Sequence, residues 1–383
     1  MSPPRAPGHW RSFDGYRAFL PDPLPPTIPW SDGLVRALSD ADRCVGRLAG
    51  EGGRLPNPHL FIRPFLRREA VLSSKIEGTQ ATLGELLAAE AGAALERSPD
   101  DLRDVANYVT AMDHGLRRLK RVPLSLRLVR ELHEQLMRGV RGDTAAPGEF
   151  RRTQTWIGPA GANVAQATYV PPPPDALMDC LGAWENFLHE QALPPLIHVA
   201  LAHYQFEAIH PFLDGNGRVG RLLIMLFLIA RQVLPAPLLY VSAFFEASRA
   251  EYYERLRGVT EDGDWNAWLE YFLRGVARMS EDVLERARQL NQRLAAWRRA
   301  LAGTSRGALL LVDALAENPF VTANGAARGI HVAFTTAQRA IAALEHRGIL
   351  QHVAGERRGR VYCAKALLKI LEAPAQLESK GTP

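Results

Sequence analysis

The sequence predicts a mainly α-helical protein, on three observations. Apolar residues recur at helical spacing through most of the chain, β-type alternation is confined to one internal interval, and the carboxy-terminal part reads as helices followed by two short strands. A chain of 383 residues that is 47% hydrophobic can bury a large core. Its length predicts two or three domains.

The composition argues against a membrane-bound or disulfide-rich protein. The longest apolar run, Leu222–Ala230, is far shorter than the roughly 20 residues that span a bilayer. The first residues contain no apolar signal-peptide core. Cys44, Cys180 and Cys363 are too scattered for a disulfide framework or a zinc site. We expect a cytoplasmic protein that makes no contact with a membrane.

The proline-rich first thirty residues predict an extended segment on the surface rather than a folded unit. Helical periodicity, capping residues and terminal glycines then predict a series of helices, the last of which is a long connecting helix. These helices are expected at residues 31–48, 62–78, 100–120, 125–139, 175–190, 195–208, 217–232, 248–257 and 280–303.

One interval, residues 150–174, departs from the helical pattern. Its sequence FRRTQTWIGPAGANVAQATYVPPPP alternates β-forming residues around a Gly-Pro-Ala-Gly turn and ends in four prolines. This pattern predicts a short β-hairpin whose far end is held by the proline run.

Residues 304–383 hold ten Lys and Arg against six Asp and Glu, a surplus of four positive charges (10 − 6) in a chain of net charge +5. The segment reads as helix, turn and helix, then a second capped helix from Thr335 to Arg347, then two strands around the letters GERRGR. The charge surplus makes nucleic acid a partner to test for this part of the chain alone.

The segment HPFLDGNGRVGR, residues 210–221, holds the densest group of candidate catalytic and ligand-binding residues. Gly215, Asn216 and Gly217 precede an apolar helix, so that backbone N–H groups and the helix dipole favour an anion there. Arg218 and Arg221 are three residues apart and share a helix face. Two converging guanidinium groups suit a phosphate chain better than a single carboxylate.

Two further side chains complete this predicted site. Asp214 would repel phosphate unless a cation lay between them, and Mg²⁺ commonly bridges one carboxylate and phosphate oxygens. His210 has an ordinary pKa near 6.5, so it can act as a general base at neutral pH. The alternative is a metal-dependent hydrolase or phosphodiesterase with His203, His210 and Asp214 as ligands. That alternative leaves the glycines and arginines unexplained.

The segment 210–221 resembles the signature of the Fic (filamentation induced by cAMP) family, His-Pro-Phe-x-(Asp/Glu)-Gly-Asn-(Gly/Lys)-Arg-x-x-Arg, at every specified position. The resemblance extends over residues 105–270, and the letters PPTIPW and SSKIEG upstream also resemble bacterial Fic proteins. It implies a magnesium-dependent transfer of AMP from ATP to a Ser, Thr or Tyr hydroxyl of a protein, with release of pyrophosphate.

The resemblance also implies a role for each site residue. His210 would deprotonate the target hydroxyl, Asp214 would hold Mg²⁺, and the interval 150–174 would be a flap that aligns the target by strand pairing. Tyr252 and Tyr253 would stack on the adenine or, equally well, pack in the core. The residues expected to bind ATP are Gly215, Asn216, Gly217, Arg218, Val219, Gly220, Arg221, Thr168, Tyr169, Tyr252 and Tyr253.

The letters SSKIEG resemble the Fic inhibitory motif (Ser/Thr)-x-x-x-Glu-(Gly/Asn). Ser73 and Glu77 are four residues apart on a predicted helix and so share a face. A carboxylate opposite Arg221 would neutralise the charge meant for the γ-phosphate. We therefore expect auto-inhibition within the chain, relieved by Glu77→Gly, with a solvated surface glutamate as the alternative.

The resemblance and the pattern together predict four parts. These are a helical region carrying the inhibitory helix (1–104), a catalytic domain (105–275), a linker helix (276–303) and a winged-helix domain (304–375). The winged helix would bind DNA, with Thr336, Gln338 and Arg339 in the major groove and Arg357, Arg358 and Arg360 on phosphates, or else serve in protein interaction or dimerisation.

A homodimer is expected by analogy alone. Three functional alternatives also remain open from the sequence. The Fic half could act as the nucleotide sensor of a DNA-binding regulator. The same site could also release AMP from a modified protein, with Glu77 positioning a water, or use another nucleotide donor.

Overall fold

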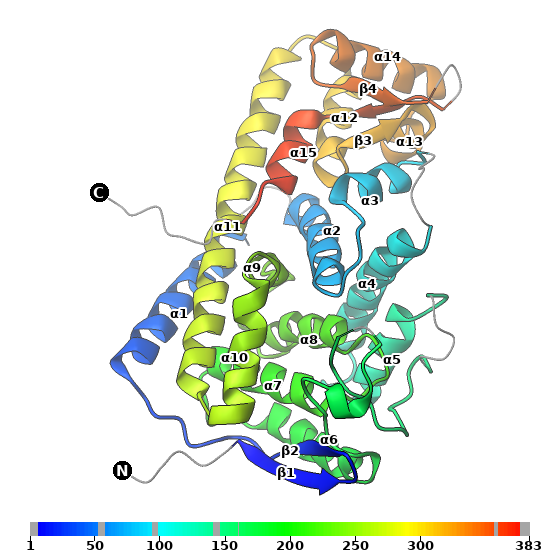
Figure 1. Cartoon of the computed structure of the whole chain (residues 1–383). Coiled ribbons are helices and arrows are strands. Elements are labelled where there is room, and N and C mark those ends of the chain that lie inside the picture. Colours follow the sequence, from blue (N-terminus) through cyan, green and yellow to red (C-terminus); the bar gives the residue numbers. More distant parts are fainter. Residues whose placement is uncertain are drawn as a thin grey trace.

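The computed structural model describes residues 7–52, 58–93, 99–140, 146–159, 161–355 and 359–375. It is predominantly helical, as expected, and Figure 1 shows the helices forming one continuous body. The helices are α1 (Asp32–Gly52), α2 (Pro58–Ile76), α3 (Leu83–Glu90), α4 (Pro99–Arg118), α5 (Leu126–Leu136), α6 (Pro174–His189), α7 (Pro195–Ile209), α8 (Asn216–Ala230), α9 (Ser242–Ala247), α10 (Arg249–Asp262), α11 (Trp265–Ala300), α12 (Arg306–Glu317), α13 (Ala323–Gly329), α14 (Phe334–His346) and α15 (Lys365–Glu372).

Helices α7 and α8 form the centre of the core. Nearly every residue of both is buried, because α5, α6 and α11 pack around them. Apolar residues therefore cover these helices on all sides, as is typical of a helix without a solvent face. The chain reverses between them over residues 210–215, which places the predicted phosphate loop at one end of this buried pair of helices.

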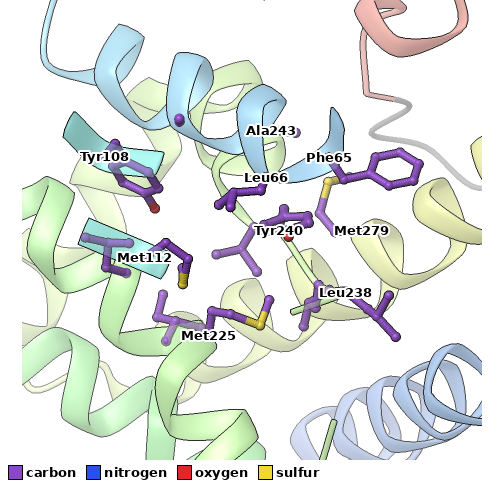
Figure 2. Close-up of a cluster of buried hydrophobic side chains, with 14 of the residues drawn as sticks. Phe65, Leu66, Tyr108, Met112, Met225, Leu238, Tyr240, Ala243 and Met279 are labelled. Carbon is purple, nitrogen blue, oxygen red and sulfur yellow. The ribbon is translucent and has the colours of Figure 1, made fainter. Parts of the chain in front are cut away.

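Helix α2 is held against this centre by a cluster of buried side chains. In Figure 2, Leu66 of α2 lies toward Tyr108 and Met112 of α4 and Met225 of α8, while Phe65 of α2 lies on the other side, beside Met279 of α11. Burying such side chains contributes about 1.5–3 kcal/mol each. The cluster fixes α2 on α4 and α8, so the end of α2 that carries the predicted inhibitory residues has a defined position.

The expectation of an extended first segment is wrong for residues 8–21. They form an antiparallel hairpin of β1 (Gly8–Phe13) and β2 (Tyr16–Pro21), with Phe13 opposite Tyr16. Asp14 and Gly15 form the two-residue turn, and Gly15 has a positive φ (+81°), a conformation that glycine adopts readily. The surrounding prolines obscured this turn signal.

The hairpin expected over residues 150–174 is also corrected. Ile157 and Tyr169 form a single antiparallel bridge, and η2 (Val164–Gln166) is a short 3₁₀ turn capped by Asn163. Four consecutive prolines from residue 171 supply no N–H donors, so a two-stranded ladder cannot extend past the bridge. We keep the name flap for residues 150–174, of which residue 160 lies outside the described part.

Helix α11 runs unbroken past the expected boundary at residue 275 and links the core to the carboxy-terminal elements (Figure 1). There α12, α13 and α14 pack together beside a three-stranded antiparallel sheet of β3 (Phe320–Thr322), β5 (Val361–Cys363) and β4 (Gln351–Ala354), in that order. α15 returns to pack on α11 and α2. The predicted phosphate contacts Arg357 and Arg358 lie outside the described residues.

No helix in the described part of the chain is both long and apolar enough to cross a membrane.

Candidate active site

A cavity of about 850 Å³ opens beside the end of α7 and the start of α8. Its wall combines the residue that follows α2 with parts of α7, α8, α10, the flap and β1, which are far apart in the sequence. Eight of the predicted site residues line it: Glu77, Thr168, Tyr169, His210, Gly217, Arg221, Tyr252 and Tyr253. The fold therefore brings the predicted base, part of the glycine loop and the predicted inhibitory carboxylate to one chamber.

His210 ends α7 in a left-handed conformation, with φ 50° and ψ 63°. This conformation is uncommon outside glycine and marks a backbone held by its surroundings. Burial lowers the pKa of His210 to about 4, and the nearby Arg151 guanidinium acts in the same direction. The imidazole is therefore neutral at pH 7, and Nδ1 has no hydrogen-bond partner among the described residues.

Asn216 builds the loop instead of facing the cavity. Its Oδ1 accepts from the N–H of Phe212 at 2.8 Å, and its Nδ2 donates to the carbonyl of Phe212 at 2.9 Å. Gly215 has φ +79°, and a Cβ there would come within 2.9 Å of Met137 Sδ. Both residues thus fix the shape of the turn that precedes α8.

His133 of α5 is a loop-supporting residue that the sequence did not reveal. Its Nε2 lies 3.0 Å from the carbonyl oxygen of Asp214, and the N–H of Gly148 donates to its Nδ1 at 2.9 Å. These bonds assign the neutral tautomer with the proton on Nε2. The ring stacks on Phe212 at 3.7 Å between centroids, and burial lowers the pKa of His133 to about 4. The sequence offered one weak signal for His133. It lies four residues before Met137 on an amphipathic helix, and this spacing places it on the inward-facing side of that helix.

The first turn of α8 presents backbone N–H groups that the helix itself leaves unpaired. Arg218 in this turn is buried. Its Nη1 lies 3.7 Å from Asp104 Oδ2, and its Nη2 lies 3.5 Å from Asp214 Oδ2. Arg218, Val219 and Gly220 do not line the cavity. Val219 packs in the core. A Cβ on Gly220 would lie 2.4 Å from Glu207 Oε1, which is closer than normal van der Waals contact. The predicted phosphate grip therefore rests on Gly217 and Arg221.

Arg221 is buried and fully engaged by α2 and the residue that follows it. Nη2 lies 2.6 Å from Glu77 Oε1 and donates to the carbonyl of Ser73 at 2.9 Å, while Nε donates to Ser73 Oγ at 2.8 Å. Burial raises the pKa of Glu77, but the Arg221 guanidinium more than offsets this and holds that pKa below its ordinary value. Burial likewise lowers the pKa of Arg221, and the nearby carboxylates reverse the effect, so its pKa is raised. Both groups are charged at pH 7.

Gly217 permits the close approach of Glu77 to α8. A Cβ at this position would lie 2.2 Å from Glu77 Oε1 and 2.9 Å from Arg221 Nη1. The carboxylate of Glu77 thus occupies space directly above the first turn of α8, where the helix dipole favours an anion.

The two tyrosines of α10 have different surroundings. Tyr252 is 1% exposed, its hydroxyl lies 2.9 Å from His203 Nε2, and its ring stacks on Phe245. Tyr253 is 44% exposed, and the Arg249 guanidinium lies over its ring. Tyr252 therefore belongs to the core at the base of the cavity, whereas Tyr253 lines the cavity with a partly exposed ring.

The flap side of the cavity contains Thr168, Tyr169 and two aromatic residues that the sequence did not single out. Tyr169 donates its hydroxyl proton to the carbonyl of Ala208 at 2.6 Å, which ties the flap to α7. Trp156 of the flap and Trp10 of β1 line the same cavity and are about 40% exposed. Glu207 also lines it, and burial raises its pKa to about 7.

Asp214, the residue expected to hold magnesium, has an exposed carboxylate. Its side chain is 60% exposed at the start of α8, and Oδ1 accepts the N–H of Gly215 at 2.6 Å. Magnesium is usually held by one or two carboxylates together with phosphate oxygens. In the described part of the chain no three His, Cys, Asp or Glu residues gather into a metal site. That finding argues against the alternative of His203, His210 and Asp214 as a protein-only metal site, and Tyr252 already occupies His203 Nε2.

A histidine at the end of one buried helix, a tight glycine turn and an arginine on the next helix are features suited to a phosphorylated ligand. Comparisons with known proteins agree with this class of site. A family profile described as Fic/DOC family N-terminal matches residues 35–117, and one described as Fic/DOC family matches residues 123–228. The chain belongs to the Fic family.

Protein adenylyltransferase Fic of Drosophila virilis is 32% identical over 190 residues, which are 48% of this chain and 35% of that protein. The Drosophila melanogaster protein of the same name is 30% identical over 190 residues, 48% of this chain and 34% of that protein. The chain thus spans about a third of the length of these curated relatives.

Two solved structures share the fold. A Fic family protein from Desulfovibrio desulfuricans G20 superposes with a TM-score of 0.60 at 20% identity, over 89% of this chain and 98% of that chain. Fic-1 (residues 134–508) from C. elegans superposes with a TM-score of 0.50 at 26% identity, over 66% of this chain and 73% of that chain.

Proposed function

We propose that the chain is an auto-inhibited protein adenylyltransferase. It would transfer AMP from ATP to a Ser, Thr or Tyr hydroxyl of a target protein, or of itself, and release pyrophosphate. The observation that carries the proposal is the Arg221–Glu77 ion pair, which sits at the start of α8 in the cavity that also holds His210. The names of the Drosophila relatives support the same reaction.

In the proposed reaction the target hydroxyl oxygen attacks the α-phosphorus of ATP. His210 takes the hydroxyl proton, the bond from the α-phosphorus to the bridging oxygen breaks, and pyrophosphate leaves with that oxygen. The unliganded imidazole is a weak base because of its burial. Bound phosphates add negative charge beside His210, which raises its pKa toward the range in which it accepts the proton readily.

The first turn of α8 would hold the phosphates. Its free N–H groups stabilise charge on the α-phosphate, and Arg221 binds the γ-phosphate once Glu77 leaves. Asp214 would hold Mg²⁺, which neutralises charge on the phosphates. Tyr253 offers its ring face to the adenine. The flap would hold the target segment beside His210, with Thr168 and Tyr169 next to the nucleotide.

Auto-inhibition follows from competition for one guanidinium. Arg221 cannot bind the γ-phosphate and the Glu77 carboxylate at once, because both require Nη2 and the space above Gly217. With Glu77 in place the triphosphate cannot extend along α8, so the α-phosphate does not reach the in-line position for attack.

The test is labelling of a cell lysate and of the protein itself from α-radiolabelled ATP. Glu77→Gly should raise labelling strongly and His210→Ala should abolish it. The matched control is Lys75→Gln, which removes a solvent-facing ion pair with Glu246 (2.7 Å) from the same end of α2. Equal labelling by wild type and Glu77→Gly would contradict the proposal.

The reverse reaction gives a different result in the same assay. If the site chiefly released AMP from a modified protein, Glu77 would position the attacking water. Glu77→Gly would then lose activity on a pre-labelled protein, while the wild type would remove the label.

A second candidate function concerns residues 304–375. The order α12, β3, α13, α14, β4, β5 matches that of a winged helix, which favours a DNA-binding or protein-interaction module. Gln338 and Arg339 are exposed on α14, as is Arg360 before β5, whereas Thr336 packs toward Gly307. A retardation assay with promoter DNA at rising salt tests DNA binding, because phosphate contacts weaken with salt.

A further inference from the structure

Arg151, at the start of the flap, makes an unusual set of hydrogen bonds. Its side chain is buried, Nε donates to the carbonyl of His210 at 2.9 Å, and Nη2 donates to the carbonyls of Pro172 at 2.6 Å and Ile209 at 3.4 Å. Nη1 donates to the carbonyl of Thr153 at 3.2 Å. One guanidinium thus joins the residue after α7 to both ends of the flap.

The backbone of Arg151 reinforces the same contact, because its N–H donates to the carbonyl of Pro211 at 2.9 Å. Arg151 and the pair His210–Pro211 are therefore bonded through both backbone and side chain. The flap base and the left-handed turn at His210 form one hydrogen-bonded unit.

Buried arginines usually face a carboxylate, because an unpaired charge is costly to remove from water. Within the part of the chain that the structure describes, no carboxylate forms an ion pair with Arg151. Its partners are carbonyl oxygens, two of which belong to the carboxy-terminal end of α7, where a positive charge is favourable. The planar guanidinium presents several donors in a fixed fork, which a lysine cannot reproduce.

We propose that Arg151 is a positioning residue, which fixes the base His210 and both ends of the flap in a single arrangement. The inference rests on the proposed function, since it assigns His210 the role of base. Arg151 acts through the backbone of His210 and touches no reacting atom. It sets the distance between the imidazole and the target segment that the flap holds.

The charge of Arg151 adds an electrostatic effect to this geometric one. The groups that act on the imidazole besides its burial are the Arg151 guanidinium, which lowers the pKa of His210, and the carboxylates of Glu77 and Asp214 and the backbone of Glu207, which raise it. Loss of the Arg151 charge should therefore raise the pKa of His210. An imidazole with a higher pKa is protonated, and so unable to accept the target proton, up to a higher pH.

Two substitutions separate the two effects when placed in the Glu77→Gly background. Arg151→Lys keeps the charge and loses the fork, whereas Arg151→Met loses both. Arg47→Met is the matched control, because Arg47 lies outside the flap on α1, is exposed, and pairs only with Glu51 at 3.7 Å among the described residues. Two measurements are made: the rate of self-labelling from radiolabelled ATP across pH, and the pKa of His210 by NMR of histidine-labelled protein, assigned with His210→Ala.

Arg151→Lys should lower the self-labelling rate about ten- to a hundredfold, as expected when a catalytic group is misplaced by about an ångström, while the affinity for ATP changes by less than about threefold. The pKa of His210 should stay low in this variant. Arg151→Met should raise it by on the order of half a unit to one unit and move the acid limb of the rate profile upward by the same amount. Arg47→Met should match its parent in both.

Parental self-labelling by Arg151→Lys would overturn the positioning role, and an unchanged pKa of His210 in Arg151→Met would overturn the electrostatic one. The NMR titration needs no activity, so it remains informative for Arg151→Met if labelling is weak. If Glu77→Gly itself transfers no AMP while His210 titrates as described, the proposed function fails and the effect of Arg151 on His210 stands.

Discussion

Arg221 Nη2 lies 2.6 Å from Glu77 Oε1, although the two residues are 144 positions apart in the sequence. The same guanidinium also binds the hydroxyl and carbonyl oxygens of Ser73, one helical turn before Glu77. The Arg221 guanidinium is thus already bound by a single stretch of chain. In the proposed function, a phosphate that binds Arg221 has to displace Glu77.

Glu77→Gln should tighten the binding of ATP. The substitution keeps the shape of the side chain and removes the charge, so Arg221 loses a charge-assisted bond worth about 1.5–3 kcal/mol. The dissociation constant for a non-hydrolysable ATP analogue should fall about ten- to a hundredfold by isothermal titration calorimetry. Lys75→Gln should leave it unchanged. A Glu77→Gln protein with wild-type affinity would show that the triphosphate does not compete with Glu77.

Ser73→Ala should relieve inhibition in part. It removes the acceptor of the Arg221 Nε–H bond and leaves both the Ser73 carbonyl and Glu77 in place. Labelling from ATP should therefore rise severalfold but remain below that of Glu77→Gly. Ser74→Ala is a close control, because Ser74 is equally buried and its hydroxyl has no hydrogen-bond partner among the described residues. A larger rise in Ser74→Ala than in Ser73→Ala would mean that activation follows general loosening of α2.

Tyr253→Ala and Tyr252→Phe should have different consequences, although the residues are adjacent. The exposed ring of Tyr253 can stack on a base, which is worth about 1–3 kcal/mol, so Tyr253→Ala should weaken ATP binding about tenfold or more. Tyr252→Phe removes the bond to buried His203 and should lower the melting temperature with little effect on affinity. Measurement of both quantities for both variants checks the assignment. Equal affinity in wild type and Tyr253→Ala would place the adenine elsewhere.

The sequence predicted the helices well because their evidence is local. Periodic apolar residues and caps placed α1, α2, α4 to α8 and α10 within a few residues of their ends. The strands were harder, because pairing depends on what a strand lies against. β1 and β2 form where β2 meets the flap, through the N–H of Phe19 and the carbonyl of Val170, and no local pattern contains that contact.

The candidate site, too, was predicted where its evidence is local and missed where it depends on three-dimensional contacts. The segment 210–221 and Glu77 were predicted from contiguous motifs, and the fold places His210, Arg221 and Glu77 on one cavity. Asn216 and Arg218 were expected to face ATP but bond the loop and Asp104, because a motif gives residue types and not side-chain directions. His133 and Arg151 lie outside every motif and act through backbone carbonyls, so only three-dimensional contacts identify them.

His133→Gln should cost stability at neutral pH by an amount that shrinks in acid. At pH 7 the variant loses the bond from Gly148 and the stacking on Phe212, a cost of about 1–3 kcal/mol. Because burial lowers the pKa of His133 from 6.5 to about 4, the unfolded wild type binds one more proton than the folded one within that window. The free energy of unfolding of the wild type therefore falls by up to about 1.4 kcal/mol per pH unit as the pH falls from 6.5 to 4, and that of the variant does not.

Urea unfolding at pH 7 and pH 5 measures both differences, with the exposed His346→Gln as the control. If the gap between wild type and His133→Gln is the same at both pH values, His133 is not the neutral support of the phosphate loop.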